Sequence, residues 1–319
     1  MTNEMAGHPS VRGAEKLALV ICLAASTLVV AAGPSSAGRI RCPAQDPCTG
    51  TNKGDHMIGT RGSDVILGLD GVSDLLSGRK GNDELRGGRG IDRVRGGRGH
   101  DVLGIGPNQE DSIPYDYREY LEGGPGHDVM YGNGGLSIFS GDGGNDTMYG
   151  RDGRDDYLYT SPDWGHDVIV DLPDADWHNI LWLSSFYDDL VIDLNSSGDH
   201  HEMRTADGSA TVDWDNDAIT FVLGGYGDDI IHGNELGNLI QVQGNDTVYG
   251  GEGNDDLGAV DWEGNATIYG GGGDNVINVH DAIHPHDGGF DTVDCGAGDA
   301  DTVYFDPNDT VVKCEILNP

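Results

Sequence analysis

Aspartates recur at a nearly constant interval along much of this 319-residue chain, and each follows closely on glycine. The clearest unit is Gly123 to Tyr131, which has the form G-G-x-G-x-D-x-U-x, where U is apolar. The aspartates in this position are Asp55, Asp64, Asp74, Asp83, Asp92, Asp101, Asp128, Asp146, Asp155, Asp229, Asp246 and Asp255. In the first six of them the step is nine residues, except for one step of ten before Asp74. Spacing this regular is typical of a repeat protein whose units stack on one another.

These residue types suit a hard cation. Glycine permits sharp turns that point backbone carbonyl oxygens inward, and aspartate adds a carboxylate. Calcium takes about six to eight oxygen ligands, so one turn would supply about half of them and a stacked neighbour the rest. The candidate ligands are therefore the motif aspartates together with the glycines two residues before them. Those glycines are Gly62, Gly81, Gly90, Gly99, Gly126, Gly144, Gly153, Gly227, Gly244 and Gly253.

An apolar residue follows nearly every motif aspartate by two positions. These residues are Met57, Ile66, Leu76, Leu85, Val94, Leu103, Met130, Met148, Tyr157, Ile231, Val248 and Leu257. The x-U-x triplet is long enough only for a very short strand, whose middle side chain points to one face. Each repeat buries little by itself, so the sequence predicts a thin core that is stabilised by stacking, as in a solenoid.

The segments from Thr49 to Gly104, 123–158 and 224–277 resemble the RTX, or haemolysin-type, calcium-binding repeats of secreted bacterial proteins. The resemblance implies an all-β fold, a parallel β-roll in which two nonapeptides form one turn and calcium ions lie between adjacent turns. It also implies that the motif aspartates are the calcium ligands.

Some repeats depart from this pattern. Lys53 replaces the glycine two residues before Asp55, Ser137 takes the place of an aspartate, and Ala266 and Asn275 replace it in two late repeats. We expect calcium sites at such positions to be weak or empty. The alternative for any single motif aspartate is a plain turn former, because Gly and Asp are common in loops, but that alternative does not explain the periodic set.

The chain is strongly acidic, with 55 acidic and 18 basic residues and a formal net charge of -37. Self-repulsion should oppose compaction, so we expect folding and calcium binding to be linked. Nucleic acid is excluded as a partner by this charge. Seven basic residues nevertheless fall between Arg79 and Arg98. They are either a patch for a polyanion or charges that offset neighbouring aspartates on a solvated edge.

The N-terminal segment has the features of a signal peptide. Arg12 and Lys16 precede an apolar run from Leu17 to Ala32, and small residues lead to Ala37, after which cleavage is predicted. An uncleaved anchor is the alternative, although the run is shorter than the ~20 residues of a spanning helix. Lipidation at Cys22 is disfavoured by the large residue before it. We predict no membrane span in the mature chain.

Four cysteines remain after that cleavage, as two pairs that are close in sequence at opposite ends of the chain. They suit an oxidising compartment, and local pairing of Cys42 with Cys48 and of Cys295 with Cys314 is the economical hypothesis. Solenoids have open ends, so disulfides there would stabilise the caps. A zinc site is disfavoured because neither pair has C-x-x-C spacing.

Two segments interrupt the repeats. The first, 105–122, is rich in proline and tyrosine and is predicted to be a loop. The second, 159–223, contains four tryptophans and strand-like runs at 190–194, 210–214 and 219–223, with a polar, turn-rich stretch at 195–207. It is predicted to be an antiparallel β insertion packed on the solenoid, with its tryptophans in a core. Exposed tryptophans that bind sugar, such as Trp164 or Trp214, are the alternative.

Catalytic motifs are missing. His200-His201-Glu202 starts like H-E-x-x-H, but Thr205 stands where the second histidine is required, and no G-x-S-x-G nucleophile elbow occurs. His280, His284 and His286 have the right chemistry for a transition metal, yet their loop-like surroundings favour surface histidines. The sequence therefore predicts no enzyme.

The sequence thus predicts an all-β parallel β-roll with an antiparallel β insertion. Its segments are a signal peptide (1–37), repeats (38–104), a loop (105–122), repeats (123–158), the insertion (159–223), repeats (224–294) and a C-terminal cap (295–319). We expect a secreted, extracellular monomer that folds on binding Ca²⁺ and serves a structural or adhesive role, with a cell-surface or extracellular polymer as a possible partner. A secreted hydrolase or a glycan-binding adhesin that uses 159–223 is the alternative.

Overall fold

The structure is a computed structural model of the chain. It describes residues 38–43, 47–70, 73–104, 118–151, 153–172, 179–183, 185–195, 201–215, 217–259, 264–280, 289–298 and 300–318. The predicted signal peptide (1–37), most of the predicted loop (105–117) and His200, His284 and His286 lie outside these residues.

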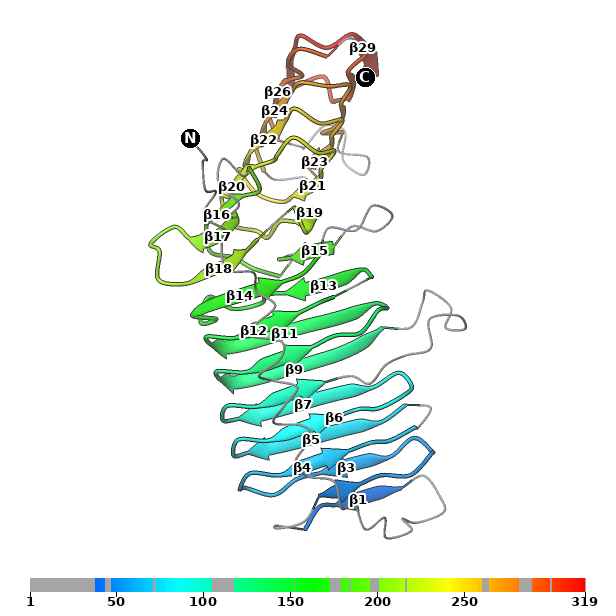
Figure 1. Cartoon of the computed structure of the whole chain (residues 1–319). Coiled ribbons are helices and arrows are strands. Elements are labelled where there is room, and N and C mark those ends of the chain that lie inside the picture. Colours follow the sequence, from blue (N-terminus) through cyan, green and yellow to red (C-terminus); the bar gives the residue numbers. More distant parts are fainter. Residues whose placement is uncertain are drawn as a thin grey trace, which may run out of the picture. The chain divides into compact units, whose positions relative to one another are not determined.

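The described residues form strands that alternate between two sheets as the chain proceeds (Figure 1). Sheet A contains, in spatial order, β1 (Arg39–Arg41), β3 (His56–Ile58), β5 (Leu75–Lys80), β7 (Arg93–Arg98), β9 (Glu119–Gly126), β11 (Ser137–Gly144), β13 (Asp155–Leu158), β15 (Asn179–Trp182), β19 (Ile219–Leu223), β21 (Leu239–Val242), β23 (Asp256–Ala259), β25 (Val276–Asn278), β27 (Thr302–Tyr304) and β29 (Ile316–Asn318).

Sheet B holds the strands between them. In spatial order these are β2 (Cys48–Thr49), β4 (Val65–Leu67), β6 (Glu84–Arg86), β8 (Val102–Gly104), β10 (Val129–Tyr131), β12 (Thr147–Tyr149), β14 (His166–Val170), β18 (Thr211–Trp214), β17 (His201–Thr205), β16 (Leu190–Asp193), β20 (Ile230–His232), β22 (Thr247–Gly251), β24 (Thr267–Gly271), β26 (Thr292–Asp294) and β28 (Thr310–Val312).

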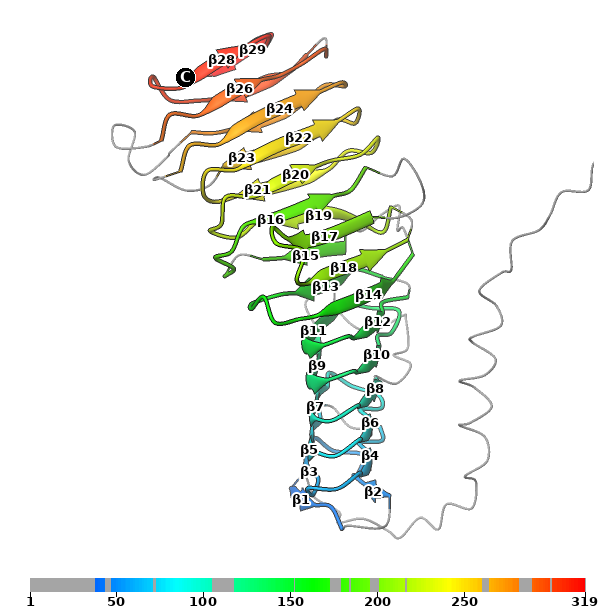
Figure 2. The same ribbon diagram turned by 90° about the vertical axis from the view of Figure 1, so that its left-hand side faces the viewer.

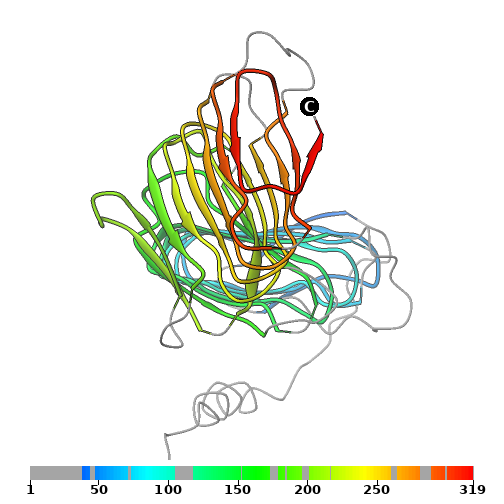
Figure 3. The same ribbon diagram turned by 90° about the horizontal axis from the view of Figure 1, so that it is seen from above.

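Each turn of the roll uses two nonapeptides, one for a strand of each sheet (Figures 2 and 3). Except at β17, neighbouring strands are parallel, and the repeats pair motif position with motif position, as in Leu76 with Val94 in sheet A and Leu85 with Leu103 in sheet B. The pairings run without a break from β1 to β29 in sheet A. The three repeat blocks therefore form one roll, and the prediction of a parallel β-roll is confirmed.

The core lies between the two sheets and is one side chain deep on each side. Every apolar motif residue from Met57 to Leu257 is at most 1% exposed, as predicted. In most of these strands the residues on either side of the motif residue face outward, as the alternation of Val65 and Val102 with the buried Ile66 and Leu103 illustrates. Such a core gains its stability from many small burials in series.

The tryptophan-rich segment builds turns of the roll. Its strands β14, β15 and β19 pair in parallel with the sheets, and the antiparallel part predicted for it is the trio β16, β17 and β18 within sheet B. The expectation that this segment packs on the solenoid was wrong, because its strands continue both ladders. Trp164 and Trp214 are 1% exposed and pack inside, so they are not exposed sugar platforms.

Two local predictions differ from the structure. The stretch 195–207 was predicted to be turn-rich, yet β17 occupies part of it, because Met203 is buried and strands pair with β17 on both sides. The loop was predicted to extend to residue 122, but β9 begins at Glu119, since Leu121 fills a core position between β7 and β11. In both cases the alternation of buried and exposed residues that marks a strand is only a few residues long, and nearby polar residues obscure it in the sequence.

Disulfides join Cys42 to Cys48 and Cys295 to Cys314, which confirms the predicted local pairing. Cys42, Cys48 and Cys295 are buried at the ends of the core. No helix among the described residues is long and apolar enough to cross a membrane.

We predict that Leu103→Ala destabilises the calcium-loaded roll by about 2–5 kcal/mol, because it leaves a cavity in a core with no second layer to collapse into it. Its neighbour Val102, which faces outward at 42% exposure, provides the matched control. Val102→Ala should change the free energy of unfolding by less than about 1 kcal/mol. Chemical denaturation in saturating calcium would measure both, and equal losses would contradict a one-layer core.

Candidate metal centre

The motif aspartates of successive turns lie directly above one another and are joined by hydrogen bonds. In sheet B the backbone N–H of Asp64 donates to Oδ1 of Asp83 at 2.8 Å, and that of Asp83 donates to Oδ1 of Asp101 at 2.7 Å. The column continues through Asp128 and Asp146. A second column in sheet A runs through Asp55, Asp74 and Asp92. Each aspartate thus satisfies the amide of the preceding turn with one oxygen.

The other carboxylate oxygen has no partner in most of these aspartates. Oδ2 is buried without a hydrogen bond, among the described residues, in Asp74, Asp83, Asp92, Asp101, Asp128, Asp146, Asp155, Asp229 and Asp255. In the first turn, Oδ2 of Asp55 and of Asp64 accepts the backbone N–H of Thr51 and of Thr60 instead. An unpaired buried carboxylate oxygen costs several kcal/mol, by an order-of-magnitude estimate. A whole column of such oxygens indicates that something positively charged belongs there.

Backbone oxygens surround these unpaired carboxylate oxygens. A Cβ placed on Gly96, the first glycine of its repeat, would overlap Asp101 Oδ2 and lie 2.8 Å from the carbonyl oxygen of Gly123 in the next turn. The same two contacts recur at Gly78 and Gly123, whereas a Cβ on Gly87 or Gly141 would meet the carboxylate of its own repeat alone. The space beside these first glycines is therefore a small cradle lined by a carboxylate and, in several turns, by a carbonyl oxygen of the next turn, and any side chain there would fill it.

Burial raises the pKa of these aspartates, because the charged form is separated from water. The pKa of Asp128 is raised to about 8, with further contributions from the negative charges of Asp146 and Asp101. Burial likewise raises the pKa of Asp74 and Asp146 to about 7 and that of Asp83 to about 6. A bound divalent cation would supply the missing opposite charge and favour the ionised form.

The donor set indicates which cation fits. No group of three or more His, Cys, Asp or Glu side chains that could hold a metal occurs among the described residues. Each cradle instead combines carboxylate with backbone carbonyl oxygens, which suits a hard cation such as calcium better than zinc. The residues present therefore fit Ca²⁺.

The fourth-position glycines have a structural role in the stacking of the turns, and their role as calcium ligands stays a prediction. Gly81, Gly99 and Gly144 have positive φ, and a Cβ at Gly99 would overlap the carbonyl oxygen of Gly81 one turn before. These glycines thus let successive turns approach closely at the edges of the roll. The glycines beside the unpaired oxygens are the first ones of each repeat, which the sequence analysis did not single out as ligands.

Residues that replace the motif aspartate keep part of its bonding. The amide of Asp255 donates to Oδ1 of Asn275 at 3.0 Å, and the amide of Ser137 donates to Oδ1 of Asp155 at 2.9 Å. Asparagine thus continues the column without the charge. This agrees with the expectation that such cradles bind cations weakly, although the expectation itself stays a prediction.

Several column members were missed by the sequence analysis. Asp167, Asp291 and Asp301 accept amide hydrogen bonds from the preceding turn. The signal was present, because Asp167 and Asp291 are each followed two residues later by a buried Ile169 or Val293. The surrounding glycines had diverged too far for the full nonapeptide to be seen.

Asp171 is a different case, since no repeat pattern marks it. Its Oδ2 accepts hydrogen bonds from the Tyr157 hydroxyl at 2.6 Å and from Asn179 Nδ2 at 2.8 Å. A Cβ on Gly150 would meet both Asp171 Oδ2 and Asp155 Oδ2. The burial of Asp155 and the nearby charge of Asp171 raise the pKa of Asp155 well above its usual value. This cradle therefore has a second carboxylate.

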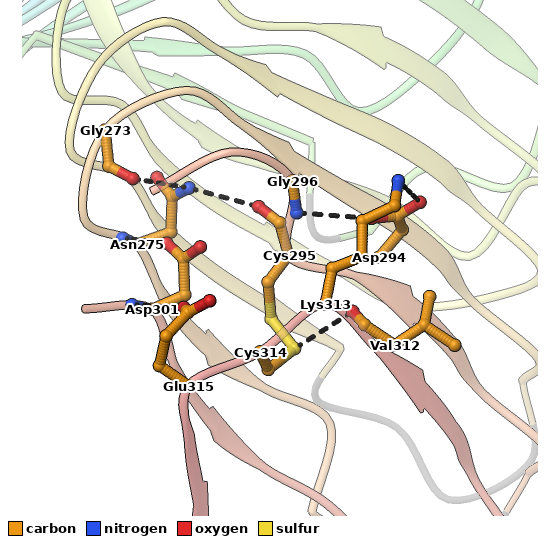
Figure 4. The surroundings of a disulfide bond; sticks show 10 residues. All are labelled: Gly273, Asn275, Asp294, Cys295, Gly296, Asp301, Val312, Lys313, Cys314 and Glu315. Atoms are coloured by element: carbon orange, nitrogen blue, oxygen red, sulfur yellow. Dashed lines mark hydrogen bonds and ion pairs between the residues drawn. A yellow bond between two sulfur atoms is a disulfide. The ribbon is translucent and has the colours of Figure 1, made fainter. Parts of the chain in front are cut away.

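The C-terminal end of the sheet A column is visible around the second disulfide (Figure 4). The amide of Asn275 donates to Asp301 Oδ1 at 2.7 Å, and the amide of Asp301 donates to Glu315 Oε2 at 3.1 Å. Cys295 and Cys314 lie beside these residues, with Lys313 paired to Asp294 at 2.7 Å. The disulfide thus holds the last turn against the end of the column.

The histidines do not form a catalytic site in the part of the chain that the structure describes. His201 lies in strand β17, 1% exposed against Trp214, so the segment lacks the helix that a zinc protease motif needs. His280 is near Asp306, with Nε2 3.8 Å from a carboxylate oxygen.

Parallel strands in two facing sheets, with carboxylates and carbonyl oxygens converging between turns, define a cation-binding β-roll. The family model of the RTX calcium-binding nonapeptide repeat matches residues 49–72, 73–103, 122–157, 215–235, 243–258 and 263–281. The chain thus contains RTX nonapeptide repeats along the roll, and such repeats bind calcium ions. No curated protein is significantly similar to the chain.

We predict that Gly96→Ala raises the calcium concentration needed for folding and costs about 1–3 kcal/mol, because its methyl group would occupy the cradle beside Asp101. Gly62→Ala is the matched control, since a Cβ there meets nothing closer than 3.9 Å. It should alter stability by no more than about 0.5 kcal/mol. Calcium titrations and melting curves of both variants would measure this, and a silent Gly96→Ala would exclude the cradle as a binding site.

Proposed function

We propose that this chain is a secreted calcium-binding scaffold in which the motif aspartates and the glycine carbonyls of adjacent turns hold the ions. The observation that carries the proposal is the column of buried aspartate oxygens that lack a partner. The carboxylates of Asp55, Asp64, Asp74, Asp83, Asp92, Asp101, Asp128, Asp146, Asp155, Asp229, Asp246 and Asp255 would supply the negative charge. Both the first and the fourth glycines would contribute carbonyl oxygens.

Calcium binding and folding would then be one equilibrium. The unfolded chain spreads its charge of -37 through water, whereas the roll gathers its motif carboxylates into two buried columns. Folding without cations would therefore bring negative charges together where they are poorly screened, which opposes folding. Cations that bind only the folded chain would make the free energy of folding favourable. Folding would await an environment with enough calcium.

An extracellular location supports this scheme. Both disulfides need an oxidising compartment, and extracellular calcium modules bind at roughly 0.1–1 mM, a concentration absent from cytosol. The protein would reach that compartment by means of the predicted signal peptide and fold there as a monomer. Without a catalytic motif, its role would be structural or adhesive.

The deciding experiment is a calcium titration of the oxidised chain followed by far-UV circular dichroism, up to about 10 mM, with magnesium as control. We expect a cooperative transition to β structure with calcium alone. Asp101→Asn should raise the midpoint about tenfold, because ligand charge tunes affinity. Asp70→Asn, an exposed aspartate outside the columns, should not. A spectrum indifferent to calcium would overturn the proposal.

The pH dependence without calcium should have the opposite sign from that of most acidic proteins. Burial raises the pKa of Asp128 to about 8 and that of Asp74 to about 7 in the roll, above the values in the unfolded chain. A raised pKa in the folded state stabilises folding below the unfolded pKa, and this contribution is lost as pH rises through the folded pKa.

Calcium-free chain should therefore show more β structure near pH 5 than near pH 8, and calcium should matter most at the higher pH. Circular dichroism from about pH 4.5 to 8.5, with and without calcium, would measure this window. A calcium-free β signal that grows with rising pH would contradict the assignment of the buried carboxylates.

A further inference from the structure

The N-terminal turns carry a group of positive charges that the calcium sites do not use. A cleft of about 390 Å³ lies at the edge where the chain leaves sheet A, and it is lined by the turn after β3 and by the C-terminal halves of β5, β7, β9 and β11. Its charged lining, here called the cationic cleft, consists of Arg61, Arg79, Lys80, Arg95, Arg98, Glu122 and Asp142. Five cations thus face two carboxylates in a chain whose net charge is -37.

Three of these cations occupy the same place in consecutive turns. Arg61, Lys80 and Arg98 each directly precede a fourth-position glycine, and Lys80 is paired in register with Arg98. Consecutive turns are one strand spacing apart, about 4.8 Å. The roll therefore displays a row of positive charges at a regular short interval along its edge, which begins at Arg61 and ends where Pro125 takes the same place.

Most of this charge is not neutralised from within the protein. Arg95 pairs with Glu122, at 2.5 Å, and Arg93 approaches the same carboxylate at 3.7 Å. Across the described residues, Arg61, Lys80 and Arg98 have no carboxylate within ion-pair distance, and neither does Arg79. All four side chains are exposed. Like charges held this close repel one another, so an external anion would stabilise the arrangement.

Arg79 adds a second observation. Its φ is +85°, and the equivalent residues of the next two turns on this edge are Gly97 and Gly124, followed by Asp142 at φ +65°. A residue with a side chain costs about 1 kcal/mol more than glycine in this conformation. The chain therefore carries a cation at a position where glycine would be more stable, in the middle of the cleft.

We propose that the cationic cleft binds a linear polymer that carries sulfate or phosphate groups. Guanidinium groups match such tetrahedral oxyanions with paired N–H donors, and a row of cations matches repeated anions better than a single small one. The roll would thus use its buried side for calcium and one edge of its first turns for an extracellular polyanion. The inference rests on the proposed calcium-folded roll, because only stacking aligns the row.

The test measures binding of the calcium-loaded full chain to dextran sulfate and to polyphosphate, with neutral dextran as control and free calcium fixed by dialysis. We expect binding to at least one polyanion, and the stronger of the two identifies the group recognised. Raising NaCl from about 50 to 200 mM should weaken binding by about 40-fold, the effect of releasing three counterions. A folded roll that binds neither polyanion would overturn the inference while leaving calcium binding intact.

Two triple variants distinguish binding at the cationic cleft from attraction by positive charge elsewhere on the roll. Arg61→Gln/Lys80→Gln/Arg98→Gln should lower affinity by about tenfold or more and remove most of the salt dependence. The matched control, Lys53→Gln/Arg86→Gln/Arg89→Gln, removes the same charge from sheet B and the other edge and should change affinity by less than about threefold. Equal losses in both variants would overturn a specific cleft.

Arg79→Gly offers a test that misfolding cannot mimic. It should weaken polymer binding while leaving the roll at least as stable, because glycine relaxes the backbone. Weaker binding together with lower stability would count against the proposal.

Sedimentation of the chain without polymer provides the last check. If the triple cleft variant alone changed the mass of the chain in solution, the cleft would be a contact between copies, and the polymer assignment would be wrong.

Discussion

The structure depends on one electrostatic constraint, the stacking of carboxylates in two buried columns. Most motif aspartates accept the amide of the preceding turn with one oxygen and leave the other unpaired beside the glycines of the repeat. Backbone pairing brings these groups to one strand spacing of about 4.8 Å, so the geometry that makes the sheets also concentrates negative charge. Cations bound beside these carboxylates would resolve this conflict, and calcium binding would then favour the folded roll.

The positions of the nonapeptide divide the physical tasks. First glycines leave room beside the carboxylate, fourth glycines such as Gly99 let turns approach, and the apolar position fills a core one side chain deep. The effect of a substitution therefore depends on the motif position at which it falls. Asn275 keeps the amide hydrogen bond of its column while it removes a charge, and so the roll continues through a repeat that has lost its carboxylate.

The variable positions face solvent and are free to differ along the roll. In the first turns they carry arginine and lysine, whereas farther along they carry stacked tyrosines such as Tyr131 with Tyr149 and Tyr249 with Tyr269. Equivalent positions of successive turns lie one strand spacing apart. When the same residue type recurs at such a position, its side chains therefore form a regular row on the surface of the roll.

The sequence by itself determined the repeat, its calcium chemistry, the buried apolar residues and the local disulfides, because these depend on residue types at fixed short spacing. Only the tertiary structure decided that the blocks form one roll, that β17 pairs within sheet B, that Asp167 and Asp301 join the carboxylate columns, and that Asp171 lies near Asp155. Those features arise where strands from distant parts of the chain come into register, and a register between turns leaves no local pattern once the glycines have diverged.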